Sequence, residues 1–423
     1  MKILVVGSGG REHALCRSFQ KSESVEKIYC ANGNAGIAEI AECLAIKPTE
    51  IEKLADFTIK NAIDLTFVGG ETSLALGIVD EFERRNLKIV GASQKAAQLE
   101  SSKSFAKDFM ARHNIPTAKY KTAFSTNEAK SILNSEFFGD ENAPTVVKAD
   151  GLAGGKGVVV ALNQREAVEA IDELENIVGK TAVEKIVLEE CLFGREVSLL
   201  AFADGANFAL MPPVRDHKRI GEGDSGANTG GMGTISDRNL LTVEQTATIV
   251  ETIIKPTLEG AKSDGFPFRG ILFIGLMLTD AGAKVLEYNV RFGDPETQVI
   301  LVQLETDFVE ICEAMLNQTL DKIQIKWQNG SAACVVLAAK NYPNKPQTGD
   351  IINGLDLVRQ FQKTEVFHAG TGTDERGNIT TAGGRVLGVT STGESLAEAI
   401  QRAYAAVNCI SWDGMQFRRD IGK

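Results

Sequence analysis

Residues 145–162 read Thr-Val-Val-Lys-Ala-Asp-Gly-Leu-Ala-Gly-Gly-Lys-Gly-Val-Val-Val-Ala-Leu, two apolar runs around a glycine-rich segment. Runs of β-branched residues favour strands, so we expect Thr145–Ala149 and Val158–Leu162 to form an antiparallel hairpin. The loop carries more glycines than a tight turn needs, and its amides could fold over a polyphosphate. Lys148 on the first strand could reach phosphate oxygens. We therefore predict a small mobile flap, and the alternative is a plain surface hairpin.

A second informative segment is residues 285–297, Val-Leu-Glu-Tyr-Asn-Val-Arg-Phe-Gly-Asp-Pro-Glu-Thr. On a strand the side chains alternate, so Glu287, Asn289 and Arg291 share one face and the intervening apolar residues share the other. A carboxylate, an amide oxygen and a guanidinium together suit a divalent cation held against a phosphate, because magnesium prefers hard oxygen ligands. An amphipathic strand with its polar face in water is the alternative.

Two weaker signals lie between these segments. Residues 187–196 could present the Glu189 carboxylate and backbone groups to an adenine and Glu196 to a ribose, although acidic residues at strand ends are usually only solvated. Residues 216–219, Asp-His-Lys-Arg, precede the glycine-rich stretch 221–233. This combination indicates either an active-site loop for an anionic substrate or a solvated loop.

The first hundred residues alternate short apolar runs, beginning with Ile3–Val6, with amphipathic stretches that include an expected helix over Ser73–Arg84. This alternation predicts a doubly wound parallel sheet, in which ligands bind at the carboxyl ends of the strands. Residues 7–10, Gly-Ser-Gly-Gly, follow the first strand, and amides at a helix N-terminus could hold a phosphate or sugar there. A nicotinamide-binding turn would need a third glycine, where Glu12 stands, and an acidic residue after the second strand, which is missing.

The pattern of expected strands, helices and loops changes along the chain and predicts three domains. This number suits a chain of 423 residues at about 100–200 residues per domain. Residues 1–102 form the N-terminal α/β domain with the doubly wound parallel sheet. Residues 103–325 form a central domain, with the flap at about 119–192. Residues 326–423 form a small C-terminal α+β domain. The predicted fold class is therefore a multidomain combination of α/β and α+β.

The amino-acid composition argues against several classes of protein. With 43% hydrophobic and 24% charged residues the chain is an ordinary globular one, and its net charge of −11 disfavours a nucleic-acid partner, which needs a basic face. The apolar run after Lys2 is too short for a signal peptide, and no run is long enough to span a bilayer. The seven cysteines are scattered, without a C-x-x-C pair. Reduced thiols are therefore expected, in a cytoplasmic protein without nucleic-acid or membrane partners.

In order, these segments resemble the ATP-grasp superfamily and, more narrowly, the phosphoribosylamine–glycine ligase family. The Lys148 hairpin resembles the phosphate flap, Glu189 to Glu196 resembles the adenine and ribose segment, and the strand from Glu287 to Arg291 resembles the metal and acyl-phosphate strand. The narrower resemblance extends over essentially the whole chain. It is carried by residues 7–15, 148–160, 216–219, 228–233, 287–298, 383–388 and 417–422.

Some loops depart from the family pattern. Gly69-Gly70-Glu71 stands where Gly-Pro-Glu is common, and Glu100-Ser101-Ser102-Lys103 stands where Glu-Gly-Ser-Lys is common. Glu71 and Lys103 are retained, so the departures concern loop shape rather than chemistry.

The resemblance implies an ADP-forming ligase that joins glycine to 5-phospho-D-ribosylamine through glycyl phosphate, giving glycinamide ribonucleotide in an early step of purine (IMP) biosynthesis. It implies an ATP-grasp core with a phosphoribosylamine-binding N-terminal domain, ATP as co-substrate, Mg²⁺ or Mn²⁺, and a monomer. The implied residues are Arg291 and Asp216 for catalysis; Lys103, Lys148, Gly154, Gly155, Lys156, Gly157, Glu189, Leu192 and Glu196 for ATP; Gly9, Gly10, Glu71 and Arg385 for phosphoribosylamine; and Glu287 and Asn289 for the metal.

Three alternatives remain at this point. A different ATP-grasp ligase or carboxylase would keep the ATP residues and change the acid or amine. A nicotinamide-dependent oxidoreductase would use the turn at residues 7–10. A non-catalytic nucleotide sensor would bind ATP without turnover, which the intact residues Glu287, Asn289 and Arg291 argue against.

Overall fold

The N-terminal apolar runs form a parallel sheet of order β3-β2-β1-β4-β5 in a computed structural model, which describes residues 1–151, 157–178 and 184–423. Residues 3–6 of the central strand are all buried, as expected for a parallel sheet covered on both faces. The predicted parallel sheet is therefore confirmed. Its strands are β1 (Lys2–Gly7), β2 (Lys27–Asn32), β3 (Glu42–Leu44), β4 (Leu65–Val68) and β5 (Ile89–Val90), and its helices are α1 (Gly10–Gln20), α2 (Ile51–Asn61), α3 (Glu71–Ala75), α4 (Ile78–Arg84) and α5 (Gln98–Ser101).

The single helix predicted over Ser73–Arg84 is wrong. The chain forms two shorter helices, α3 and α4, with Gly77 between them. Gly77 has φ +85°, a left-handed conformation that glycine adopts at little cost and that cannot continue a right-handed helix.

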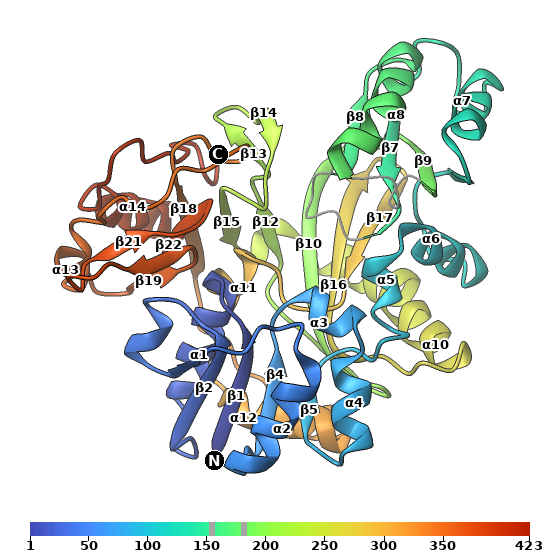
Figure 1. Ribbon diagram of the computed structural model, residues 1–423. Helices are drawn as coiled ribbons and strands as arrows, with labels where there is room; N and C mark the ends of the chain where they lie inside the picture. Colours follow the sequence, from blue (N-terminus) through green and yellow to red (C-terminus); the bar gives the residue numbers. More distant parts are fainter. Residues whose placement is uncertain (152–156, 179–183) are drawn as a thin grey trace.

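The flap is a four-stranded sheet of order β6-β9-β7-β8 with its own small apolar core. The predicted antiparallel hairpin is confirmed, since Thr145 pairs with Ala161 and Lys148 pairs with Val158. Figure 1 shows the flap, in green, on the opposite side of the molecule from the C-terminal domain. Its elements are β6 (Tyr120–Ala123), α7 (Thr126–Asn134), β7 (Thr145–Ala149), β8 (Val158–Ala161), α8 (Gln164–Val178) and β9 (Ile186–Glu190), and α6 (Lys103–Arg112) precedes it.

A larger sheet of order β17-β16-β10-β12-β15-β18-β22-β19, with β11 beside β10, runs from the central region into the C-terminal region. Because β15 pairs with β18, one sheet continues across the predicted domain boundary near residue 326. Its strands are β10 (Arg195–Asp204), β11 (Phe208–Leu210), β12 (Val214–Asp216), β15 (Gly233–Ser236), β16 (Arg269–Thr279), β17 (Gly282–Asn289), β18 (Ser331–Ala338), β19 (Thr364–His368) and β22 (Arg385–Gly393).

Further elements are two short ribbons and the α-helices of the central and C-terminal regions. Within the described residues, no helix combines the length and the apolar character needed to cross a bilayer. These elements are β13 (Arg219–Gly221) with β14 (Ser225–Asn228), β20 (Thr371–Thr373) with β21 (Ile379–Thr381), α9 (Val243–Ile249), α10 (Lys255–Ser263), α11 (Glu296–Leu301), α12 (Phe308–Asn317), α13 (Leu355–Val358) and α14 (Leu396–Val407).

A cluster of phenylalanines joins the N-terminal sheet to the larger sheet. The ring of Phe308, on α12, lies 4.9 Å from that of Phe19 and 5.4 Å from that of Phe67, both in the N-terminal domain. It also lies 6.3 Å from Phe292, just after β17, and 6.4 Å from Phe202 on β10. Such offset aromatic contacts add to the free energy gained by burying the rings. We call this set the phenylalanine cluster.

Phe308→Ala should lower the free energy of unfolding by about 3–5 kcal/mol, the usual cost of removing a buried phenylalanine. The matched control is Phe124→Ala, because Phe124 is 64% exposed and its loss should change stability by less than about 0.5 kcal/mol. Urea denaturation followed by tryptophan fluorescence measures both. Equal midpoints for the two variants would show that the cluster does not hold the domains together.

Candidate functional site

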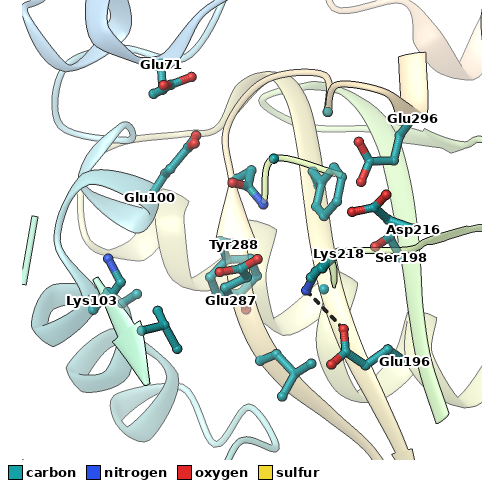
Figure 2. Close-up of a pocket in the computed structure, with 18 of the residues that line it drawn as sticks. Glu71, Glu100, Lys103, Glu196, Ser198, Asp216, Lys218, Glu287, Tyr288 and Glu296 are labelled. Carbon is teal, nitrogen blue, oxygen red and sulfur yellow. Dashed lines mark hydrogen bonds and ion pairs between the residues drawn. The ribbon is translucent and has the colours of Figure 1, made fainter. Parts of the chain in front are cut away.

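A cavity of about 440 Å³ lies between the flap, the larger sheet and the N-terminal domain. Figure 2 shows acidic and basic side chains from the N-terminal domain, from α6 and from the larger sheet around this cavity. Of the residues predicted from sequence, the cavity is lined by Glu71, Lys103, Lys148, Gly157, Glu189, Glu196, Asp216, Glu287, Asn289, Arg291 and Arg385.

Among the described residues, three predicted site residues do not line the cavity. Leu192 follows β9, and Gly9 and Gly10 lie at the start of α1. Gly154, Gly155 and Lys156 fall in 152–156, outside the described residues.

In the flap, Glu189 on β9 is held by two lysines. Its carboxylate lies 2.8 Å from Lys107 Nζ and 2.7 Å from Lys148 Nζ, and the second contact is an ion pair outside hydrogen-bond geometry. The three side chains are at most 10% exposed. Burial lowers the pKa of Lys107 to about 8, although Glu189 opposes the change. The pairing fixes Lys148 beside the cavity.

A bulge in β17 shapes the floor beneath Lys148. Val285 pairs with Leu276 and Glu287 pairs with Gly275, so Leu286 is an extra residue on its strand. The strict alternation predicted for this strand is therefore interrupted, and Leu286 lines the cavity together with Glu287. The Leu286 carbonyl accepts a hydrogen bond from Lys148 Nζ at 3.3 Å.

The carboxylate of Glu287 lies among positively charged side chains. Burial would raise the pKa of its carboxyl, but Lys218, Lys148 and Lys103 outweigh burial and lower it. Glu287 is therefore ionised at neutral pH. In the part of the chain that the structure describes, no hydrogen bond or ion pair engages its carboxylate directly.

Glu287 and Asn289 fit a magnesium ion better than a metal held wholly by protein. Among the described residues, no group of three or more His, Cys, Asp or Glu side chains is arranged around a metal position. Magnesium needs less, since it keeps water and is usually bound through one or two carboxylates plus phosphate oxygens. Asn289 Oδ1, which accepts a hydrogen bond from Arg291 at 3.1 Å, is a second hard oxygen next to the free Glu287 carboxylate.

At the N-terminal end of the cavity, Arg291 lies between two carboxylates. Its Nη2 is 2.6 Å from Glu100 and its Nε is 3.2 Å from Glu71. Glu100 also accepts the Val290 amide at 2.8 Å, so it holds both the backbone and the side chain at the end of β17. Burial raises the pKa of Glu100, whereas Arg291 and Arg11 outweigh the effect of burial on Glu71 and lower its pKa.

The glycine turn after β1 is closed by Glu12. This side chain is 2% exposed, accepts the Gly9 amide at 2.5 Å and pairs with Arg11 at 2.6 Å. A Cβ atom at Gly7 or Gly69 would lie 2.4 or 2.1 Å from it, so both glycines make room for the glutamate. Glu12 thus fills the space where a dinucleotide fold receives a pyrophosphate, which argues against the nicotinamide alternative. The Gly9 amide is also not free for a phosphate.

Arg385, the first residue of β22, brings the C-terminal region to the cavity. It donates to the carbonyls of Gly230 and Asp294, and its Nη2 lies 3.3 Å from the Asp294 carboxylate. The contacts join the predicted Asp216 loop, the segment after β17 and the C-terminal domain at one point.

The structure adds cavity residues that the sequence reasoning did not single out. Lys107 lies one helical turn after Lys103, and this i, i+4 spacing could have indicated it. Glu100, Lys218 and Glu296 lie within or beside motifs already noted, but only their spatial neighbours mark them as part of the site. Lys218 pairs with Glu196 at 3.0 Å, as the dashed line in Figure 2 marks.

Comparisons with known proteins agree with one architecture throughout. Models for the phosphoribosylglycinamide synthetase N domain, ATP-grasp (A) domain and C domain match residues 1–100, 101–297 and 332–423. The chain is 46% identical over 423 residues to the phosphoribosylamine–glycine ligase of Caldanaerobacter subterraneus subsp. tengcongensis, covering 100% of this chain and 99% of the relative. A crystal structure of phosphoribosylamine–glycine ligase from Thermotoga maritima aligns over 100% of both chains, with a TM-score of 0.85 and 32% identity.

A more distant structure shares the fold. The biotin carboxylase domain of 2-oxoglutarate carboxylase from Hydrogenobacter thermophilus, in complex with MgADP, ADP and bicarbonate, aligns with a TM-score of 0.73. The match covers 98% of this chain and 91% of that chain at 18% identity. At this identity the likeness concerns the fold alone.

Glu189→Gln should lower the free energy of unfolding by about 3–5 kcal/mol, because it leaves two buried lysines without their counter-charge. The same change at Glu196 is the control, since Glu196 and Lys218 are 48% and 44% exposed and their pair should contribute only about 0–1 kcal/mol. Urea denaturation at pH 7 compares the two. If Glu196→Gln were the more damaging change, Glu189 would not be the residue that holds Lys107 and Lys148 in place.

Proposed function

The chain belongs to the phosphoribosylglycinamide synthetase family, and we propose that it uses ATP to ligate glycine to 5-phospho-D-ribosylamine. The products are glycinamide ribonucleotide, ADP and phosphate, formed in an early step of purine biosynthesis. The observation that carries this proposal is the shared cavity. Flap residues suited to a nucleotide, such as Lys148 and Glu189, face residues of the N-terminal domain, such as Glu71, across the Glu287 strand.

The chemistry proceeds in two transfers. A carboxylate is a poor electrophile, because its charge repels a nucleophile. A glycine carboxylate oxygen therefore first attacks the γ-phosphorus of ATP, ADP leaves, and glycyl phosphate forms. The phosphoribosylamine nitrogen then attacks the acyl carbon, phosphate leaves, and the nitrogen loses a proton to give the amide. Both transfers depend mainly on positioning and on neutralising charge.

For the nucleotide we propose the flap end of the cavity. Lys148, fixed by Glu189 and by the Leu286 carbonyl, and Lys103, whose Nζ lies 2.9 Å from the Gly151 carbonyl, would contact phosphate oxygens. Burial lowers the pKa of Lys103, and an anionic phosphate beside it would favour its charged form. Glu189 and the segment after it would hold adenine, and Glu196 would exchange its ion pair with Lys218 for the ribose hydroxyls.

For the metal we propose Glu287 and Asn289. Mg²⁺ or Mn²⁺ bound there would neutralise the negative charge of the phosphate oxygens and help to hold the phosphates in position. Arg291 lies next to both side chains and would neutralise the carboxylate of glycine or the acyl phosphate. The carboxylates of Glu71 and Glu100 hold that guanidinium in place.

For phosphoribosylamine we propose the end of the cavity formed by the N-terminal and C-terminal domains, with Glu71 and Arg385 as contacts. We further propose that the protein acts as a monomer in the cytoplasm. All seven cysteines are free thiols, which suits a reducing compartment.

Release of ADP tests the proposed function. With ATP, Mg²⁺ and the purified chain, sustained ADP release should require both glycine and freshly prepared phosphoribosylamine, because without the amine the glycyl phosphate that forms first is not consumed. A coupled assay of ADP gives the rate, and mass spectrometry identifies the amide. Turnover with another acid or amine, and none with this pair, would assign the cavity to a different ATP-grasp ligase.

Glu287→Ala should lower kcat/KM by roughly 10- to 100-fold or more. A loss of this size is usual when a side chain that supports a metal site is removed. It should also raise the Mg²⁺ concentration needed for half-maximal activity, since the remaining Asn289 oxygen is a weaker ligand than a carboxylate. A Mg²⁺ titration at saturating substrates measures the shift. An unchanged titration curve would remove Glu287 from the metal site.

A further inference from the structure

A second cavity, of about 310 Å³, lies between the N-terminal and C-terminal domains. Its walls come from α1 and the short 3₁₀ helix Ile37–Glu39 on one side and from α13 and β19 on the other. Figure 1 shows α1 beside β19. Among the described residues, none lines both this cavity and the main one, and the roles assigned above do not use it. We call it the interdomain cavity.

Two buried histidines line the interdomain cavity, His13 with 8% and His368 with 6% exposure. His13 Nδ1 accepts a hydrogen bond from the His368 amide at 2.8 Å, so the proton of the neutral His13 ring sits on Nε2. His368 Nδ1 lies 3.2 Å from the Thr371 hydroxyl. In the part of the chain that the structure describes, neither Nε2 atom has a hydrogen-bond partner. Buried polar groups are normally paired, so two unpaired ring nitrogens at the wall of one cavity point to a ligand.

Both histidine rings are neutral at pH 7. Burial lowers the pKa of His13 to about 3, and His368 and Arg17 add to the effect. Burial also lowers the pKa of His368 to about 4, and Arg359 adds to the effect. His13 therefore offers an N–H donor rather than a charge. The arginine charges that disfavour protonation of the two rings would attract an anion into the same space.

The two arginines line the interdomain cavity from opposite domains. Arg17 Nε lies 3.3 Å from Glu365, and Arg359 Nη2 lies 3.0 Å from Glu39, so both ion pairs cross between the domains. The arginine side chains are 45% and 64% exposed. Exposed ion pairs contribute little to stability, because water competes for both partners. Either guanidinium can therefore turn an N–H group toward a ligand at little cost.

Another part of the wall is apolar. Phe367 and Val358 line the interdomain cavity and are each 2% exposed. The ring of Phe367 stands edge-on to that of His13, with the centroids 5.7 Å apart. A bare inorganic ion would leave these apolar surfaces without contacts. A ligand with an apolar or planar body would cover them and gain the free energy of burial. The cavity volume is at the lower end of the roughly 300–1,000 Å³ found for small-molecule sites.

On this geometry we propose that the interdomain cavity binds a small organic anion. Its acidic group, a carboxylate or a phosphate, accepts hydrogen bonds from His13 Nε2 and from the guanidinium groups of Arg17 and Arg359. Its apolar or planar body lies against Phe367 and Val358. The bound molecule joins the N-terminal domain to the C-terminal domain. The proposal is independent of the reaction proposed above.

Phenyl phosphate and benzoate are suitable probes, because each joins an acidic group to a planar apolar ring. Benzamide is the matched control, since it keeps the shape of benzoate without the charge. Calorimetric titration is carried out at saturating ADP and Mg²⁺, so that the main cavity is occupied. At least one of the two acids should bind saturably, and benzamide should bind roughly tenfold more weakly or not at all. The acid that binds more tightly identifies the acidic group of the ligand.

Arg359→Gln locates the binding. Because this side chain is largely exposed, the variant should fold. The Kd of the bound acid should rise roughly 10- to 100-fold, as for loss of a charge-assisted hydrogen bond. Arg17→Gln is the second variant, with the same expectation. Arg376→Gln changes an exposed arginine of the C-terminal domain outside the cavity, and as the control it should alter the Kd less than about 3-fold.

Histidine NMR spectra locate the probe by a second route. The chain has four histidines, and two of them, His113 and His217, do not line the interdomain cavity. His113→Gln and His217→Gln assign the signals of these two, which leaves those of His13 and His368. Addition of the acid should shift the latter pair saturably and leave the His113 signal in place.

Saturable shifts of the His13 and His368 signals, with weaker binding in Arg359→Gln and Arg17→Gln, support the site. The site is overturned if neither acid binds, if benzamide binds as tightly as the acids, or if the His217 signal alone shifts. None of these results depends on turnover of glycine and phosphoribosylamine, so the test leaves the proposed function to its own assay.

Discussion

Burial of Phe292 in the phenylalanine cluster is the constraint on which the site depends. Its ring lies 6.2 Å from Phe67 of the N-terminal sheet and 6.1 Å from Phe202 of the larger sheet. Packing of Phe292 against both sheets therefore fixes the position of the chain just after β17, between two domains. Arg291 precedes it directly, so the guanidinium can project into the cavity from a backbone that packing has already placed. The Glu100 contact to the Val290 amide secures the same point by hydrogen bonding.

Charge within the cavity is organised in pairs that position reactive groups. Glu189 places Lys148, and Glu71 with Glu100 places Arg291. Such buried pairs contribute little net stability, because desolvation offsets most of their attraction. Their value lies in orientation: a lysine or arginine held by a carboxylate is already aligned when an anionic substrate arrives. Glu287 differs from this pattern, because no residue that the structure describes pairs directly with its carboxylate, which suits a cation that comes with the substrates.

The sequence was sufficient to predict those elements that depend only on residues close together in the chain. The flap hairpin follows from two β-branched runs around glycines, and the parallel sheet follows from alternating strands and helices. Local patterns failed where a single backbone angle or a neighbouring strand decided the outcome. Gly77 splits one expected helix, and the extra residue Leu286 in β17 interrupts an expected alternation. The bulge cannot be predicted without knowing which strand pairs with β17. The closing of the first glycine turn by Glu12 likewise depends on the neighbouring strands.

By itself, the sequence determined the kinds of groups available and their order along the chain, because propensity and periodicity act over a few residues. The motifs therefore pointed to a nucleotide, a divalent cation and an anionic substrate before any distance was known. Only the tertiary structure decided which charges are paired and which are free. Asp216 and Glu296 are far apart in the chain and meet through the packing of α11 against β12 and β15. Electrostatic interaction depends on distance and burial, and both are set by that packing rather than by sequence spacing.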